Sequence, residues 1–224
     1  MSSEEVPEGW EMKKCSELFE FTNGKAFYMD GYSDSGYRVI DLLNISLEGR
    51  LNLTPKDKYI SPEVYEKYAK SHLRENDLII IMTDITPSLG LIGKTAIIDK
   101  NDCYVLNQRV GCLRPQPNLS VCVPFFNYLF NSNAIRLQVV GESRGTAQFY
   151  VNTTSIKGLQ IPTPPLPEQQ KIASILTSVD DVIETTQAQI EKLQDLKTAT
   201  MNELLTKGIG HTEFKDSELG PIPE

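Results

Sequence analysis

Apolar residues recur at alternating spacings of four and three near the C-terminal end of the sequence. The residues between them are mostly polar or charged, and neither glycine nor proline occurs from position 171 to 207. This spacing is typical of the seam of a coiled coil. We therefore predict one helix over 167–207, which would be about 60 Å long at 1.5 Å per residue. The stripe consists of Ile172, Leu176, Val179, Ile183, Thr186, Ile190 and Leu193.

Four prolines lead into this predicted helix, at positions 162, 164, 165 and 167. Proline fixes φ and lacks an N–H donor, so we expect an extended hinge over 162–166. Pro167 can be the first helical residue, because its missing N–H costs nothing there. Gly208 and Gly210 end the helix. Many amphipathic helices pack on their own domain, but this one far exceeds the average of about 11 residues, which favours pairing with another helix.

The preceding residues, 1–161, have the pattern of a globular domain of mixed α and β structure. Ser61 and Pro62 mark the start of a short helix. A second helix is expected over 123–140, with Phe126, Leu129 and Phe130 facing the core. Alternating or β-branched runs predict strands at 37–45, 77–83, 91–99 and 103–113. The predicted fold class is α+β: a mostly antiparallel sheet with clustered helices, followed by the long helix.

Composition supports a folded core and gives no sign of a membrane span. Hydrophobic residues make up 40% of the chain, and the longest uninterrupted apolar run, at 78–82, is far below the roughly 20 residues that a span needs. The first residues lack the pattern of a secretory signal, so we expect a cytoplasmic protein. No cysteine belongs to a Cys-x-x-Cys pair, which favours reduced thiols over a metal site. The cysteines are Cys15, Cys103, Cys112 and Cys122.

The net charge of −8 is concentrated at the two ends of the chain. Residues 163–224 carry a net charge of −6 and residues 1–20 a net charge of −4, whereas residues 21–162 carry +2. The middle of the chain can therefore present a local basic face, so the overall acidity does not exclude a polyanionic partner.

No catalytic constellation stands out in the sequence. The segment GLIGKT at 90–95 lacks the spacing of a phosphate-binding loop, and Gly93 more simply marks a bend or a close backbone approach. The only histidines, His72 and His211, are expected at the surface. Acidic ligands for a nuclease remain open at three positions, namely Asp77, Asp84 and Asp99.

Polar loops that carry basic and amide side chains are the more distinctive feature. They lie at 22–38, 83–94, 106–109 and 141–148. Arg, Lys, Asn and Gln can hydrogen-bond to base edges, and hydroxyl groups suit phosphate oxygens. Any one of these loops alone is an ordinary surface connection.

Three segments together carry a family likeness: LIIIMTDITPSLGLIGKTAII, LNQRVGCL, and the hinge and helix start PPLPEQQKIA at 164–173. They resemble the specificity (S) subunit of type I restriction–modification enzymes, over roughly residues 8–207. In that family a DNA-reading domain and a long helix are usually repeated in tandem. The tail at 208–224 resembles the junction to the second repeat, so we expect this chain to be one half, either a natural half-subunit or a fragment.

The resemblance implies a non-catalytic subunit that recognises double-stranded DNA through residues 1–161. It also implies partners: methyltransferase subunits, which use S-adenosylmethionine, and restriction subunits, which use ATP and magnesium. We expect no cofactor in this chain itself. The exposed stripe predicts an antiparallel homodimer through Ile172, Leu176, Val179, Ile183, Ile190 and Leu193. The expected DNA contacts are Lys25, Ser88, Lys94, Arg109, Arg144, Thr146 and Gln148.

Two other functions remain open at this point. The chain could be a coiled-coil module that binds another protein and not DNA, in which case it would lack salt-sensitive DNA binding. It could also be a DNA-modifying enzyme with degenerate motifs, which would bind S-adenosylmethionine or alter DNA alone.

Overall fold

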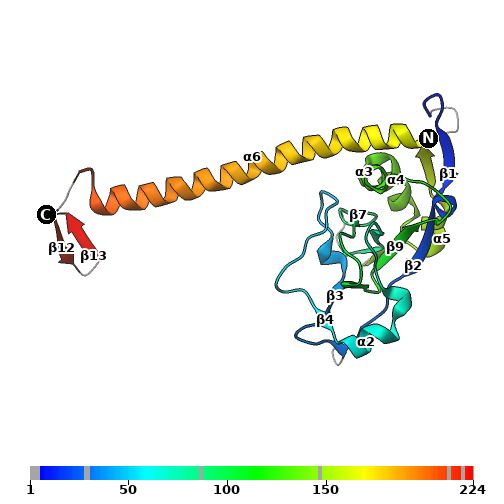
Figure 1. Ribbon diagram of the computed structural model, residues 1–224, viewed down its shortest axis with the longest axis horizontal. Helices are drawn as coiled ribbons and strands as arrows, with labels where there is room; N and C mark the ends of the chain where they lie inside the picture. The colour runs from blue at the N-terminus through cyan, green and yellow to red at the C-terminus, as the bar shows by residue number, and fades with distance from the viewer. Residues whose placement is uncertain are drawn as a thin grey trace. The chain divides into compact units, whose positions relative to one another are not determined.

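The computed structural model describes residues 6–27, 31–85, 88–145, 148–210, 213–217 and 220–223. They belong to two compact units, Met1–Ala173 and Ser174–Glu224. Figure 1 shows the elements of each unit.

The first unit is built on a four-stranded antiparallel sheet in the order β2-β9-β5-β7. Strand β5 carries the apolar run of the sequence, and all four of its residues are buried. Because side chains alternate along a strand, Leu78 and Ile80 enter the core on one face, and Ile79 and Ile81 enter a second core on the other. The strands are β2 (Phe19–Asn23), β9 (Val110–Pro115), β5 (Leu78–Ile81) and β7 (Thr95–Ile97).

Helices cover the face of this sheet that bears Leu78 and Ile80. Phe126 packs edge-on against Phe19 with ring centroids 5.2 Å apart, and Phe130 does so at 6.2 Å. The expected inward-facing residues are confirmed, since Leu129 also packs partly on this core. The helices are α1 (Cys15–Leu18), α3 (Val123–Asn131), α4 (Asn133–Glu142) and α5 (Thr153–Gly158).

The single helix predicted over 123–140 is in fact two helices, α3 and α4. The break is at Ser132, whose backbone is extended and whose Oγ donates to the carbonyl of Leu129 at 2.6 Å. A serine hydroxyl that bonds nearby backbone competes with the helical ladder, which explains the break. The short helix α2 (Pro62–Lys67) is confirmed, with Ser61 Oγ accepting from the N–H of Val64 at 3.4 Å.

A second sheet, in the order β4-β3-β8, lies beside the other core and places the parallel pair β3–β8 next to the antiparallel pair β3–β4. The α+β class is confirmed, but the strands are shorter than predicted. The segment 37–45 leaves strand geometry after Ile40, because Asp41 caps the 3-10 turn η2 (Leu42–Asn44). The segment 103–113 turns at 107–109. The strands are β3 (Tyr37–Ile40), β4 (Tyr59–Ile60) and β8 (Tyr104–Leu106).

The other two expected strands are also interrupted. The segment 77–83 contains β5 and then β6 (Thr83–Asp84), which pairs with β10 (Phe149–Tyr150). In the segment 91–99 only Thr95–Ile97 forms a strand. Gly93 has a φ of +78°, and a β-carbon there would lie 2.9 Å from the side chain of Val139. The expected close backbone approach at this glycine is therefore confirmed.

The proline-rich segment is partly a strand. Pro162 belongs to β11 (Gln160–Thr163), which pairs with β1 (Glu11–Lys14) as an antiparallel two-stranded sheet. A two-stranded sheet leaves an unpaired edge, where the missing N–H of proline does no harm.

The sequence PLPEQQ anchors the first turns of α6 (Leu166–Lys207) within the first unit. The carbonyl of Pro165 accepts from the N–H groups of Glu168 and Gln169. Gln169 is 3% exposed; its Oε1 accepts from the N–H of Cys122 at 3.0 Å, and its Nε2 donates to the carbonyl of Pro164 at 2.9 Å. A buried amide with both ends bonded fixes the helix start, which gives this motif a structural role.

The second unit contains the rest of α6, followed by the strands β12 (Phe214–Ser217) and β13 (Gly220–Pro223), which pair antiparallel. The helix starts one residue before the predicted position and ends at Lys207 as predicted. Its 42 residues correspond to about 63 Å. The two C-terminal strands were not predicted.

Candidate nucleic-acid interface

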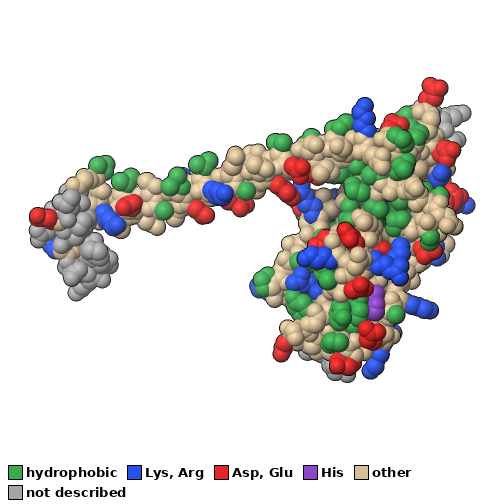
Figure 2. All heavy atoms as spheres, viewed as in Figure 1, with side chains coloured by type: hydrophobic (Ala, Val, Ile, Leu, Met, Phe, Trp, Pro, Cys, Tyr) green, Lys and Arg blue, Asp and Glu red, His purple; other side chains and the backbone are tan. Residues whose placement is uncertain are grey.

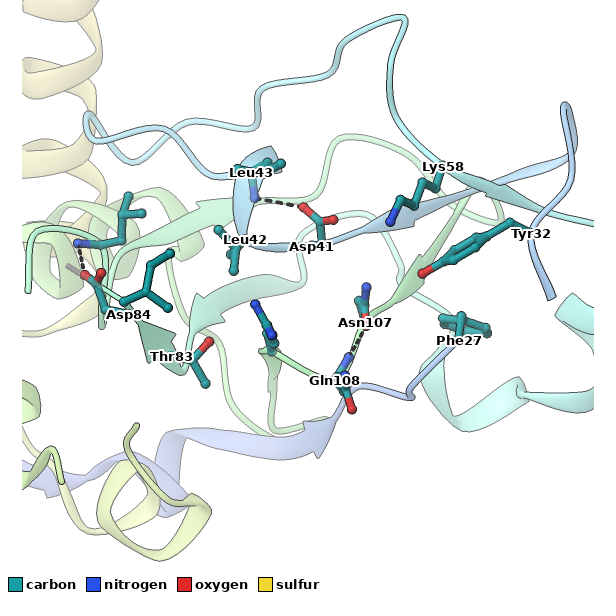
Figure 3. A pocket seen from close by; sticks show the side chains of 13 residues that line it. Phe27, Tyr32, Asp41, Leu42, Leu43, Lys58, Thr83, Asp84, Asn107 and Gln108 are labelled. Atoms are coloured by element: carbon teal, nitrogen blue, oxygen red, sulfur yellow. Dashed lines mark hydrogen bonds between the residues drawn. The ribbon is translucent and has the colours of Figure 1, made fainter. Parts of the chain in front are cut away.

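A cleft of about 430 Å³ opens on the first unit. Five segments form it: the residues before β3, η2 with the preceding Asp41, the residue before β4, β6 with the loop that follows it, and the turn between β8 and β9. Figure 3 shows several of its polar side chains directed toward one space. Its lining residues are Phe27, Tyr32, Asp41, Leu42, Leu43, Lys58, Thr83, Asp84, Ile85, Leu91, Asn107, Gln108 and Arg109.

The turn Asn107-Gln108-Arg109 is a polar element of this cleft that is held by backbone hydrogen bonds. Asn107 donates its N–H to the carbonyl of Ile40 at 2.9 Å, and its Oδ1 accepts from the N–H of Gln108 at 2.7 Å. The carbonyl of Arg109 accepts from the N–H of Met82 at 3.0 Å. The backbone of the turn is thus fixed by neighbouring strands, so its side chains start from a defined position.

Gly24 packs directly beneath this turn. A β-carbon at Gly24 would overlap the carbonyl oxygen of Asn107, so only glycine allows the two backbones to come this close. The next residue, Lys25, forms a β-bridge with Asn107 and donates its N–H to the carbonyl of Leu106 at 2.9 Å. The exposed Lys25 ammonium lies 5.5 Å from the ring centroid of Tyr68, a cation–π distance.

Both carboxylates that line the cleft accept hydrogen bonds from backbone N–H groups. Asp84 is 3% exposed, and its Oδ2 accepts from the N–H groups of Leu91 and Ile92 at 2.8 and 3.2 Å. Asp41 Oδ1 accepts from the N–H of Leu43 at 2.8 Å. These bonds tie both carboxylates to the backbone, and the cleft also presents the cations of Lys58 and Arg109.

Among the expected contact residues, Arg109 lines the cleft and Lys25 adjoins it. Arg144 and Gln148 are exposed, and Arg144 forms a two-bond β-bridge with Tyr150. Gln148 directly precedes β10, and the partner strand of β10, β6, supplies Thr83 and Asp84 to the cleft. Strand β10 therefore lies next to the cleft. Thr146 lies outside the described residues.

The other two expected contact residues do not line the cleft. Ser88 is exposed in the loop that follows Ile85. Lys94 is half-buried, and its pKa is lowered by burial and by the neighbouring guanidinium of Arg136. Arg136 Nη2 also donates to the carbonyls of Leu89 and Gly90 at 2.7 and 3.0 Å. Arg136 of α4 thus holds this part of the loop at Leu89 and Gly90.

Sequence reasoning missed several residues of the cleft. Asn107 and Gln108 lay within a polar loop that was recognised, but Arg109 alone was selected from it. Tyr32 also lay within a recognised loop, at 22–38, but was not selected. Lys58 gave no local signal, because it joins the cleft only in the fold, where its ammonium lies 4.8 Å from the ring centroid of Tyr32.

The three acidic residues that remained open as nuclease ligands each hold the fold together. Asp77 accepts from Arg114 Nε and Nη2 at 2.8 and 2.6 Å, and Asp99 accepts from the hydroxyl of Tyr104 at 2.8 Å. Asp84 binds backbone, as described above. Within the described part of the chain, no three His, Cys, Asp or Glu side chains gather as they would around a metal ion.

His72 was expected at the surface; the structure leaves its side chain half-buried, with one part accessible and the ring packed against the fold. Its ring stacks on that of Tyr65 with centroids 3.5 Å apart, and its Nε2 bonds to the Tyr65 carbonyl at 2.7 Å. Tyr65 also stacks on Tyr37 at 3.6 Å, so His72 ends a packed row of three rings. His211 lies outside the described residues.

The expected free thiols are confirmed for all four cysteines, of which Cys15 and Cys112 are buried. Burial raises the pKa of Cys15 to about 12. A membrane-spanning helix, long and apolar throughout, is not found among the described residues.

The fold and the motifs point to one class of protein, the DNA specificity domains of type I restriction–modification systems. A protein-family model described as the type I restriction modification DNA specificity domain matches residues 7–195 of this chain. This chain belongs to that family.

Relatives extend the match over nearly the whole chain. A putative type I restriction enzyme MjaX specificity subunit from Methanocaldococcus jannaschii is 32% identical across 98% of this chain and 51% of its own length. The MjaVIII specificity subunit of the same organism is 27% identical across 90% of this chain and 47% of its own length. The chain thus spans about half the length of these relatives.

A solved structure shares the fold. The type I restriction–modification S subunit from M. genitalium superimposes with a TM-score of 0.60 at 17% identity, covering 91% of this chain and 47% of that one. The HsdS subunit from Thermoanaerobacter tengcongensis gives a TM-score of 0.55 at 17% identity.

Proposed function

We propose that this chain is a DNA-recognition half of a type I specificity subunit, which reads one part of a split target site and directs partner subunits to it. Family membership supports this function, and the observation that carries it is the cleft itself. Its fixed turn presents an amide pair and a guanidinium, the groups that hydrogen-bond to base edges. Lys58 and the adjoining Lys25 supply charges suited to phosphate oxygens.

The chain itself is proposed to be non-catalytic. The carboxylates that would serve nuclease chemistry are engaged in structural bonds and lie on separate elements, which supports this view. Methylation with S-adenosylmethionine, and cleavage that depends on ATP and magnesium, would then be carried out by the methyltransferase and restriction subunits.

We further propose that two copies associate through α6 as an antiparallel homodimer. From Ser174 onward the apolar side chains of this helix are exposed, including Leu176, Val179, Ile183, Ile190 and Leu193. A second copy would remove this strip from water, and a two-fold dimer would read a symmetric target. Ile172 packs partly on the core of the first unit, so it has less surface to offer than the other residues of the stripe.

The exposed apolar face is wider than the predicted seam. It also includes Ile175 and Val182, and further along Leu196, Met201, Leu204 and Leu205. A single facing helix covers a narrow a/d seam. We therefore assign the remaining apolar surface to partner subunits.

The test of this function is salt-dependent DNA binding by the chain assembled with its methyltransferase subunits. Duplexes selected from a random library should bind, and log K should fall linearly with log salt, as counterion release requires. A random duplex of equal length is the control. Binding that lacks both sequence preference and salt dependence would contradict the proposal and favour a protein-interaction module.

A further inference from the structure

Two large apolar side chains stand exposed at the cleft. Leu43 is 73% exposed and Ile85 is 71% exposed, and both line the cleft. Single exposed apolar residues are common on protein surfaces. These two are unusual because they flank one cleft, on different segments, together with the half-buried Leu42 and Leu91.

Leu43 is held in its exposed position by the surrounding backbone. It is the middle residue of η2, where Asp41 Oδ1 accepts its N–H, and Asn44 Oδ1 accepts the N–H of Asp41 at 2.9 Å. Asn44 is buried and donates to the carbonyl of Asn52 at 3.0 Å. These bonds fix the backbone at Leu43, so the exposure of its side chain follows from a defined local structure.

The backbone that leads into Ile85 is also held in place. Ile85 follows β6, which pairs with β10, and the preceding Asp84 carboxylate binds the N–H groups of Leu91 and Ile92. The residue before Ile85 is therefore held both by the pairing with β10 and by the N–H groups of Leu91 and Ile92. Figure 3 shows Leu42, Leu43, Thr83 and Asp84 near one end of the cleft, and Asn107 and Gln108 further along it.

The cleft therefore combines an apolar end with a row of hydrogen-bonding groups. The major groove of DNA offers a matching surface, because each thymine presents a 5-methyl group beside the hydrogen-bonding atoms of its neighbours. A protein partner could also supply a methyl group. The cations of Lys58 and Arg109, together with the adjoining Lys25, outnumber the two lining carboxylates, which favours a polyanion.

We propose that Leu43 and Ile85 form a thymine-methyl contact that contributes to target specificity, next to base contacts from Gln108 and Arg109. This inference rests on the proposed DNA-binding function and deepens it. It predicts that the half-site read by this chain contains at least one thymine whose methyl group is buried in the complex.

The test replaces thymines one at a time with deoxyuridine, which lacks only the methyl group. The duplex is the one selected by the chain assembled with its methyltransferase subunits. Because burying one methyl group is worth about 0.8 kcal/mol, we expect affinity to fall about fourfold at one position. In Leu43→Ala or Ile85→Ala, wild-type duplex should bind more weakly by a similar factor, and the deoxyuridine effect should shrink toward none.

Leu47→Ala is the matched control. Leu47 is 56% exposed in the segment that follows η2, but it does not line the cleft, so the full deoxyuridine effect should persist in this variant. Circular dichroism should show that all three variants are folded. The inference is overturned if no thymine position is sensitive, or if sensitivity is undiminished in both cleft variants. If the wild-type assembly shows no sequence-specific DNA binding, that result would instead contradict the proposed function.

Discussion

The cleft and the helix α6 are held together by opposite means. The cleft depends on residues far apart in the chain, such as Gly24 against Asn107 and Asn107 bonded to Ile40. From Ser174 to Lys207, the helix depends on its own backbone ladder, and nearly all of its side chains are exposed. The long-range bonds of the cleft fix its side chains in position for recognition. The exposed helix instead presents an apolar face that a partner can cover. Figure 2 shows apolar side chains along the visible face of the helix.

The largest effect is expected from breaking a long-range bond in the first unit. Asp77 is 1% exposed and paired with Arg114, so Asp77→Ala leaves a guanidinium without its partner and should lower the free energy of unfolding by about 3–5 kcal/mol. Urea denaturation measures this change. The exposed Asp34→Ala should change stability little, and equal effects of the two variants would argue against the ion pair.

On the helix, a charge should abolish pairing without unfolding the first unit. Ile183→Glu places a carboxylate in the proposed seam, and burying it in both copies should weaken the dimer by at least about 3 kcal/mol. Sedimentation equilibrium at micromolar concentration reports the change. Ala188→Glu adds the same charge on the opposite helical face and should leave the dimer intact. A wild-type monomer under these conditions would refute the homodimer.

Within the cleft, Arg109→Ala should weaken binding to the selected duplex by about 1–3 kcal/mol if the guanidinium contacts a base. Arg144, near β10, is another of the DNA contacts expected from the sequence, and Arg144→Ala should have an effect of the same size if that guanidinium contacts a base. Fluorescence anisotropy on both variants decides which arginine reads bases. The exposed Arg74, outside the cleft, provides the control.

The smallest effect is expected for Lys58→Ala. A phosphate contact should weaken binding by a similar factor for every sequence and reduce the slope of log K against log salt by about one. Glu66→Ala, on α2, is the control, and its slope should not fall. An unchanged slope in Lys58→Ala would remove this residue from the interface.

The helix was predictable from sequence and the cleft was not, for a physical reason. A stripe such as Leu176, Val179 and Ile183 is a local repeat, so it can be read directly from the sequence. The break at Ser132 and the turn to η2 after Asp41 depend on single side chains that bond nearby backbone, which periodicity does not show.

The candidate site was predictable only as a set of loops. Arg109 was selected for its chemistry and lines the cleft. Lys25, also selected, adjoins the cleft through its bridge to Asn107. The cleft also includes Leu43 of η2, Lys58 before β4 and Ile85 after β6. These segments come together only in the fold, and no local sequence pattern predicts that they do.

The most direct test of the central claim, that this cleft contacts DNA, is photo-crosslinking with 5-iodouracil. The assembled complex would be irradiated on its selected duplex carrying 5-iodouracil at each thymine position in turn, and the crosslinked peptides mapped by mass spectrometry. We predict crosslinks within the segments that line the cleft, especially at Phe27 or Tyr32. Crosslinks confined to α3, α4 or α5, on the far face of the central sheet, would contradict the account.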